Sequence, residues 1–212
     1  MKNLFIIFIL FSFSLSAQKI DKKDEKTKSY NSIINNEVTT DQGLFKVHKK
    51  GDEYYYEIHP SQLNQEMLMV TRIAKTINGI GYGGQKINSQ VLRWQKKNNQ
   101  ILLRIVSYEN IASDSLPIYE SVRNSNFEPI LYAFEIETHN PEDSSVLINV
   151  SPLFNTDVKA LGFPQFRRKS LKITSLDKKR SFIESIKSFP TNIEVRNVLT
   201  YISTDPPSTR NS

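Results

Sequence analysis

The sequence predicts a mainly β protein, in which antiparallel hairpins form a sandwich- or barrel-like β domain with one to three short helices. Apolar and polar residues alternate over several short segments, a pattern typical of half-buried strands. Two-residue turn signals, Gly51-Asp52 and Asn98-Asn99, separate two pairs of such segments. With 212 residues and no cysteine, the chain can form about one domain and does so without disulfides.

Residues 44–50 and 53–59 form the first predicted hairpin. If Lys50 pairs with Glu53, the apolar side chains gather on one face, which we expect to be buried. These apolar residues are Phe45, Val47, Tyr54, Tyr56 and Ile58. The other face carries Lys46, His48, Lys50, Glu53, Tyr55, Glu57 and His59. Its polarity predicts a face in contact with solvent.

His48, Glu57 and His59 share that polar face and suggest a metal triad. The predicted pairing puts His48 and His59 four residues apart along the sheet. This is roughly 13 Å at about 3.3 Å per residue, too far for one ion. The third histidine, His139, lies in a turn signal, and the motif His-Glu-x-x-His does not occur. We therefore expect no metal and no cofactor in this chain.

Residues 91–97 and 100–108 form the second predicted hairpin. Pairing Lys97 with Gln100 places Trp94 opposite Leu103 on an apolar face, so the only tryptophan should belong to the core. The same register sets Arg93 against Arg104. That pair is unfavourable unless an acidic residue lies nearby, and the sequence does not identify one.

Weaker patterns predict the remaining elements. A short helix is expected over residues 30–38, a largely buried third strand over 66–75, and a loop with one helical turn over 114–126. Strands are expected over 130–138 and 146–150, and Ser151 is suited to cap a short helix. Residues 181–189 favour a strand over a helix, and 193–203 predict a strand that is buried on both faces toward its end.

Two further patterns suggest chemistry. Residues 79–84 match G-x-G-x-x-G, but a dinucleotide site needs these glycines to open a helix, and residues 85–94 are strand-like. A tight loop between antiparallel strands is the better interpretation. Glu135 and Glu137 point the same way on a strand and could act as an acid–base pair. A solvent-facing strand is favoured because no polar cluster accompanies them, so we expect no catalytic residue.

The formal net charge of +6 is concentrated in one segment. Residues 162–180 hold seven basic residues and one acid, Asp177, so their excess equals that of the whole chain. The basic residues are Arg167, Arg168, Lys169, Lys172, Lys178, Lys179 and Arg180. We expect an exposed basic loop and a candidate interaction surface for another domain or an acidic partner. A nucleic-acid partner is disfavoured because few aromatic residues are interleaved.

The N-terminus predicts export. A short positive start, an apolar run over residues 4–11 and the small residues Ser16 and Ala17 are typical of a cleaved signal peptide over residues 1–17. The apolar run is shorter than the roughly 20 residues of a membrane-spanning helix. We therefore expect a secreted or periplasmic protein without stable membrane insertion. This location also disfavours a nucleic-acid partner.

Several segments carry a family resemblance when taken in order. They are Gly-Leu-Phe-Lys-Val-His-Lys at 43–49, Tyr-Tyr-Tyr-Glu-Ile at 54–58, Tyr-Gly-Gly at 82–84, and Phe-Pro-Thr-Asn-Ile-Glu-Val-Arg with Leu-Thr-Tyr within 189–201. With them, residues 30–203 resemble the N-terminal, non-catalytic region of exported bacterial zinc-dependent metalloproteases of the metzincin type. In that family two consecutive domains of unknown function precede the catalytic domain.

The resemblance implies a function without supplying an active site. The family's zinc ligands lie in His-Glu-x-x-His and a third histidine of the catalytic domain, and no position of this sequence matches them. We expect residues 18–29 to be a charged linker, 30–75 a helix-plus-hairpin subdomain, 76–203 a β-rich accessory domain and 204–212 a linker-like tail. The chain would be a fragment or truncated product, inactive alone, whose partners are the catalytic domain and a protein or peptide substrate.

A second hypothesis comes from a different class of protein. The chain could be a stand-alone exported β-module that binds a protein or a glycan. An in-frame or frameshifted His-Glu-x-x-His motif encoded downstream would favour the first hypothesis, and unrelated downstream sequence would favour the second.

Overall fold

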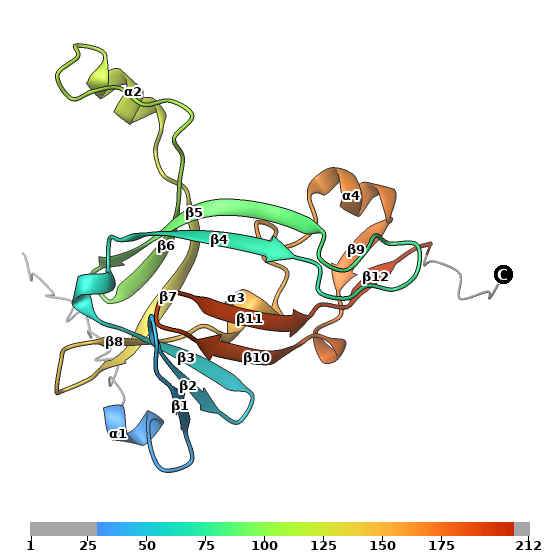
Figure 1. Cartoon of the computed structure of the whole chain (residues 1–212), viewed down its shortest axis with the longest axis horizontal. Helices are drawn as coiled ribbons and strands as arrows, with labels where there is room; N and C mark the ends of the chain where they lie inside the picture. The colour runs from blue at the N-terminus through green and yellow to red at the C-terminus, as the bar shows by residue number, and fades with distance from the viewer. Residues whose placement is uncertain (1–28, 206–212) are drawn as a thin grey trace, which may run out of the picture.

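The computed structural model describes residues 29–205, which form a curled, eight-stranded antiparallel sheet and two smaller two-stranded sheets (Figure 1). The main sheet has the order β1-β2-β3-β8-β7-β6-β5-β4. Its strands are β1 (Thr39–Asp41), β2 (Lys46–Lys50), β3 (Glu53–Ile58), β4 (Glu66–Arg72), β5 (Lys86–Lys97), β6 (Gln100–Val106), β7 (Ile130–His139) and β8 (Val146–Asn149). The predicted signal peptide, nearly all of the predicted linker and most of the predicted tail lie outside the described residues.

The smaller sheets and the helices complete the described part of the chain. One small sheet pairs β10 (Phe182–Ser188) with β11 (Ile193–Val198), and the other pairs β9 (Ile173–Leu176) with β12 (Tyr201–Ser203). The helices are α1 (Tyr30–Ile33), α2 (Tyr119–Ser125), α3 (Ser151–Asn155) and α4 (Gln165–Ser170), with 3-10 turns η1 (Pro60–Gln62) and η2 (Lys178–Arg180). The predicted mainly β fold is confirmed. None of the helices found between residues 29 and 205 has the length and apolarity to cross a membrane.

The registers of both predicted hairpins are confirmed. Lys50 pairs with Glu53 and Val47 with Tyr56 in the first hairpin. In the second, Lys97 pairs with Gln100 and Trp94 with Leu103. Asn98 adopts a left-handed backbone with φ 54°, which suits a two-residue turn. Alternation in the sequence therefore specified which face of each strand turns toward the main core.

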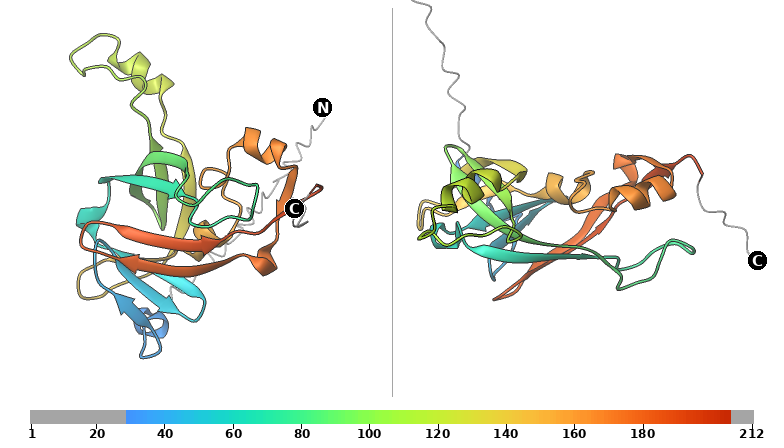
Figure 2. Two further views of the ribbon diagram at one scale, coloured as in Figure 1. Left: turned by 45° about the vertical axis from the view of Figure 1, so that its right-hand side comes forward. Right: turned by 90° about the horizontal axis from the view of Figure 1, so that it is seen from above.

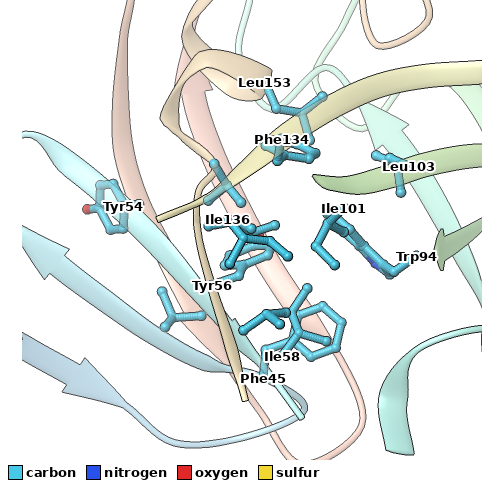
Figure 3. Close-up of a cluster of buried hydrophobic side chains, with 14 of the residues drawn as sticks. Phe45, Tyr54, Tyr56, Ile58, Trp94, Ile101, Leu103, Phe134, Ile136 and Leu153 are labelled. Atoms are coloured by element: carbon cyan, nitrogen blue, oxygen red, sulfur yellow. The ribbon is translucent and has the colours of Figure 1, made fainter. Parts of the chain in front are cut away.

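The main apolar core lies on one face of the main sheet, beneath the β10–β11 hairpin and α3 (Figures 1 and 3). Trp94 packs among aromatic rings in this core. Its ring centroid lies 5.9 Å from that of Phe45, 6.1 Å from that of Tyr56 and 5.7 Å from that of Phe134. These spacings are those of tilted and edge-on aromatic pairs. The only tryptophan is thus a core residue, as predicted.

Two segments far apart in the sequence, residues 43–45 and 188–189, meet beside the first hairpin. The Leu44 amide donates to the carbonyl oxygen of Phe189 at 2.7 Å, and the Ser188 hydroxyl donates to the carbonyl oxygen of Phe45 at 2.7 Å. A Cβ at Gly43 would lie 2.7 Å from both the backbone nitrogen and the oxygen of Phe189, so only glycine fits this close approach. The segments 43–49 and 189–201, which carry the family resemblance, therefore adjoin in space.

Four local predictions are corrected. The first helix ends at Ile33 instead of Val38. β4 lies at the edge of the sheet, and Leu68 is 68% exposed, so this strand is not largely buried. The segment 193–203 is broken between β11 and β12 and is half-buried or exposed, because β11 covers the sheet from outside. Ser151 is the first residue of α3, and its hydroxyl accepts the Tyr54 amide instead of capping the helix.

Candidate functional site

The polar face of the first hairpin is not in contact with solvent, contrary to prediction. His48 and Glu57 are each 2% exposed. α1 and the neighbouring loops cover this part of the sheet. Ile33 of α1 packs there with Tyr55 and Leu147 in a small apolar cluster, separate from the main core. Alternation alone could not reveal this second covering layer, because the residues that form it lie outside the strands.

A buried carboxylate is at the centre of the covered face. One oxygen of Glu57, Oε2, accepts from Tyr30 Oη at 2.6 Å and contacts His48 Nε2 at 2.9 Å. The other, Oε1, accepts from Lys46 Nζ at 2.6 Å and Asn140 Nδ2 at 2.9 Å. We call these five residues the Glu57 cluster. They come from α1, β2, β3 and the turn after β7, so the cluster joins four separate parts of the chain.

The protonation states in the Glu57 cluster follow from this geometry. Burial by itself would raise the pKa of Glu57, but hydrogen bonds from His48, Lys46, Tyr30 and Asn140 together lower it well below its usual range. The hydrogen bond to Glu57 raises the pKa of Lys46. Burial, followed by the hydrogen bond to the carboxylate, raises the pKa of Tyr30. At neutral pH the cluster therefore holds a carboxylate beside an ammonium group.

The chemistry of the Glu57 cluster is that of a structural anchor. His48 Nδ1 lies 2.8 Å from the Thr40 hydroxyl, so hydroxyl, imidazole and carboxylate follow one another as they do in nucleophilic enzymes. In such enzymes the carboxylate orients the histidine. Here the carboxylate also binds Lys46, Asn140 and Tyr30. The imidazole is enclosed, and both of its ring nitrogens have partners. The group positions strands and α1 relative to each other.

The other candidate metal and acid–base residues do not join this cluster. His59 is exposed and accepts the Ser61 amide at the start of η1. Within residues 29–205, the histidine, aspartate and glutamate side chains form no group of three or more that could hold a metal ion. Glu135 and Glu137 line a shallow depression with Asn149 and Pro152, and Glu135 accepts from Gln100 across the β6–β7 pair.

The glycine-rich segment 79–84 is a loop between β4 and β5, as predicted. Gly79, Gly81 and Gly84 have positive φ angles, and a strand follows instead of a helix. Arg167 donates to the carbonyl oxygen of Ile80 at 2.6 Å and ties this loop to α4. The loop therefore lacks the helix N-terminus that would hold a pyrophosphate.

The basic segment is folded, and its charges differ in exposure. Arg168 is 8% exposed and forms a bidentate pair with Asp157, with N–O distances of 2.9 and 2.5 Å. Lys172 pairs with Asp205, and Arg180 with Asp177. Lys169, Lys178 and Lys179 are exposed. The expected exposed loop is therefore an α4–β9–η2 unit in which Arg168 is a structural residue.

The like-charged pair Arg93–Arg104 is confirmed, and the structure supplies its acidic partners. Arg93 binds Glu128 at 2.8 Å and Glu66 at 2.6 Å. Arg104 donates to the Glu128 carbonyl oxygen at 2.7 Å, and its guanidinium carbon lies 5.1 Å from the Phe127 ring centroid. Glu66 also accepts from Tyr108. These contacts fix both ends of the connection between β6 and β7 to the sheet.

That connection is the surface feature that sequence reasoning missed. Residues 107–129, which include α2, leave the body as a long projection that we call the arm (Figures 1 and 2). Its apolar residues were apparent in the sequence. Their exposure follows only from the distance between the arm and the body.

The fold defines a class of antiparallel β module with an anchored arm and a separate basic unit (Figures 1 and 2). The family model described as "Domain of unknown function (DUF5117)" matches residues 84–212, more than half of the chain, and the chain belongs to this family. A second model, "Domain of unknown function (DUF5118)", matches residues 27–76. No curated protein matches the chain. No solved structure matches it either.

Proposed function

We propose that the chain is a non-catalytic accessory module of an exported zinc-dependent metallopeptidase of the metzincin type and is inactive alone. The residues that carry the resemblance support this assignment, because segments 43–49 and 189–201 build one junction of the fold. A signal peptide over residues 1–17 would deliver the module to the periplasm or the medium.

The Glu57 cluster is the observation that carries the proposal. It contains the acid–base groups that resemble a catalytic set most closely, and it uses them to hold α1 and the first hairpin together. A carboxylate with four donors has no position left for a substrate or an attacking water. A module whose acid–base residues hold its own fold together suits a role in folding, latency or substrate presentation.

Zinc content and peptide hydrolysis of the purified chain test the proposal. The accessory role predicts sub-stoichiometric zinc after dialysis and no hydrolysis of a mixed fluorogenic peptide library. A zinc peptidase measured in parallel serves as the positive control. Stoichiometric zinc accompanied by hydrolysis that a chelator abolishes would contradict the proposal.

The second candidate is a stand-alone exported β-module that binds a protein or a glycan. The exposed apolar residues of the arm favour the protein-binding form, because uncovered apolar surface is typical of interaction sites. Submicromolar binding of one glycan or protein ligand, with no effect of the chain on any exported metallopeptidase, would favour this candidate.

A further inference from the structure

The arm exposes more apolar surface than an ordinary connection. All residues from 107 to 127 are exposed or half-buried. Ile111 and Phe127 are each 74% exposed, Ile118 57%, Tyr108 55% and Leu116 51%. Apolar side chains gathered in this way on one projection are typical of a protein–protein contact.

The arm is held in a defined direction. Its first residues are fixed by the contact of Tyr108 with Glu66, and its last by the contacts of Glu128 with Arg93 and Arg104. These contacts lie at the base of the arm, so they orient it and leave Ile111, Leu116 and Ile118 exposed. An oriented segment loses less conformational freedom on binding than a loose loop does.

The arm and the α4–β9–η2 unit have complementary charges. The arm carries four carboxylates against one basic residue, Arg123. Glu128 binds Arg93 at the arm base and Glu120 pairs with Arg123, so Glu109 and Asp114 supply most of the negative charge that the arm exposes. The α4–β9–η2 unit exposes Lys169 and Phe166 on α4, where Phe166 is 74% exposed, and Lys178 and Lys179 on η2 at the other end of β9. Each surface therefore combines charge of one sign with uncovered apolar side chains, and together they can bury both.

We propose that the arm of one copy docks on the α4–β9–η2 unit of a second copy. The body separates the two surfaces in Figures 1 and 2, so the arm does not reach the unit of its own chain. In a two-fold pair each arm meets the unit of its partner, which uses both surfaces and closes the assembly. The dimer does not depend on the proposed peptidase association.

Two charge-reversed forms of the full chain test this dimer. The first carries Glu109→Lys and Asp114→Lys on the arm, and the second carries Lys178→Glu and Lys179→Glu on the basic unit. All four positions are exposed, so the fold should persist, and circular dichroism checks this. Sedimentation velocity is measured for the wild type, for each form alone and for their equimolar mixture.

The wild type is expected to be mostly dimeric at about 100 μM in low salt if the dissociation constant is micromolar. Dimer affinity should fall as the salt concentration rises. Each reversed form alone should dimerise at least roughly tenfold more weakly, because like charges then face each other. The mixture should regain the dimer, because both contacts are again between opposite charges. Ile111→Ser with Ile118→Ser should weaken the wild-type dimer without changing its salt dependence.

Three results would overturn the dimer. They are a wild type that stays monomeric at this concentration, reversed forms that dimerise as well as the wild type, and a mixture that remains monomeric although both forms are folded. A monomer whose arm binds a different protein would equally exclude the second copy as the partner.

Discussion

Arg93 lies opposite Arg104 in the β5–β6 pairing, and both guanidinium groups contact Glu128. Arg93 binds the Glu128 carboxylate, and Arg104 binds the backbone oxygen of the same residue. One residue at the base of the arm thus offsets the repulsion between two cross-strand arginines. The strand pairing predicted from the sequence did not identify an acidic partner for these two arginines. Glu128, at the base of the arm, is that partner.

Glu128→Gln should loosen the arm without unfolding the body. The change removes the charge that Arg93 binds at the arm base, and this partly exposed pair contributes about 1 kcal/mol or less to global stability. Hydrogen exchange followed by mass spectrometry should show faster exchange over residues 107–129 and unchanged exchange in β3 and β8. Glu120→Gln, within the arm and far from its base, serves as the control. Equal protection of the arm in wild type and Glu128→Gln would show that the ion pair does not orient it.

Glu57→Gln should be strongly destabilising. It leaves Lys46 and its neighbours without their buried counter-charge, and breaking a buried pair costs roughly 3–5 kcal/mol. Urea unfolding provides the measurement. Glu53→Gln, on the same strand but exposed, should change the free energy of unfolding by about 0.5 kcal/mol or less. Equal effects of the two changes would refute the structural role of the Glu57 cluster.

The stability of the protein should depend on Glu57 ionisation at acid pH. The folded-state pKa of Glu57 lies below its ordinary value of 4.5, so its contribution is present above that pH and is lost as pH falls toward the folded pKa. Between about pH 5 and pH 3, the free energy of unfolding should fall more steeply in the wild type than in Glu57→Gln. Parallel curves for the two proteins would contradict the lowered pKa.

Trp94 should report the integrity of the core. Its side chain is 6% exposed among aromatic neighbours, so native fluorescence should resist quenching by acrylamide and shift to longer wavelength on unfolding. Trp94→Ala should cost about 3–5 kcal/mol. The exposed aromatic change Tyr82→Ala should cost about 0.5 kcal/mol or less. Ready quenching in the native state would mean that the tryptophan is not enclosed.

Gly43→Ala should disrupt the junction between residues 43–45 and 188–189. The added Cβ would lie 2.5 Å from Ser188 Oγ and 2.7 Å from two backbone atoms of Phe189. Such overpacking costs typically about 1–3 kcal/mol because backbone must move. Thermal unfolding gives the difference, with the neighbouring exposed change Gln42→Ala as the control. An unchanged melting temperature in Gly43→Ala would show that the junction opens without cost.

Alternation of apolar and polar residues predicted the hairpins well because it encodes both the register and the face that turns toward the main core. Val47, Tyr54 and Trp94 are buried as expected. The edge position of β4 was not predictable in the same way. Its apolar residues read as a buried strand, but burial depends on which elements pack over it, and Leu68 faces outward.

The Glu57 cluster illustrates the same limit for sites. The hairpin pattern placed His48 and Glu57 on one face, which was right, but it could not show that Tyr30 and Asn140 converge there from 27 and 83 residues away. The sequence of a strand does not show whether its polar side chains form hydrogen bonds with water or with other side chains. The arm could not be predicted for a related reason. In the sequence its apolar residues resemble core residues, and only the structure shows that they lie on a segment that projects from the body.

Direct binding tests the accessory role most closely. The full chain would be titrated calorimetrically into the catalytic domain of an exported metzincin-type peptidase from the same genome, and peptide hydrolysis by that domain would be recorded in the same samples. The accessory role predicts saturable one-to-one binding that changes the rate of hydrolysis or the stability of the catalytic domain. The absence of binding to any such domain, together with unchanged hydrolysis, would contradict it.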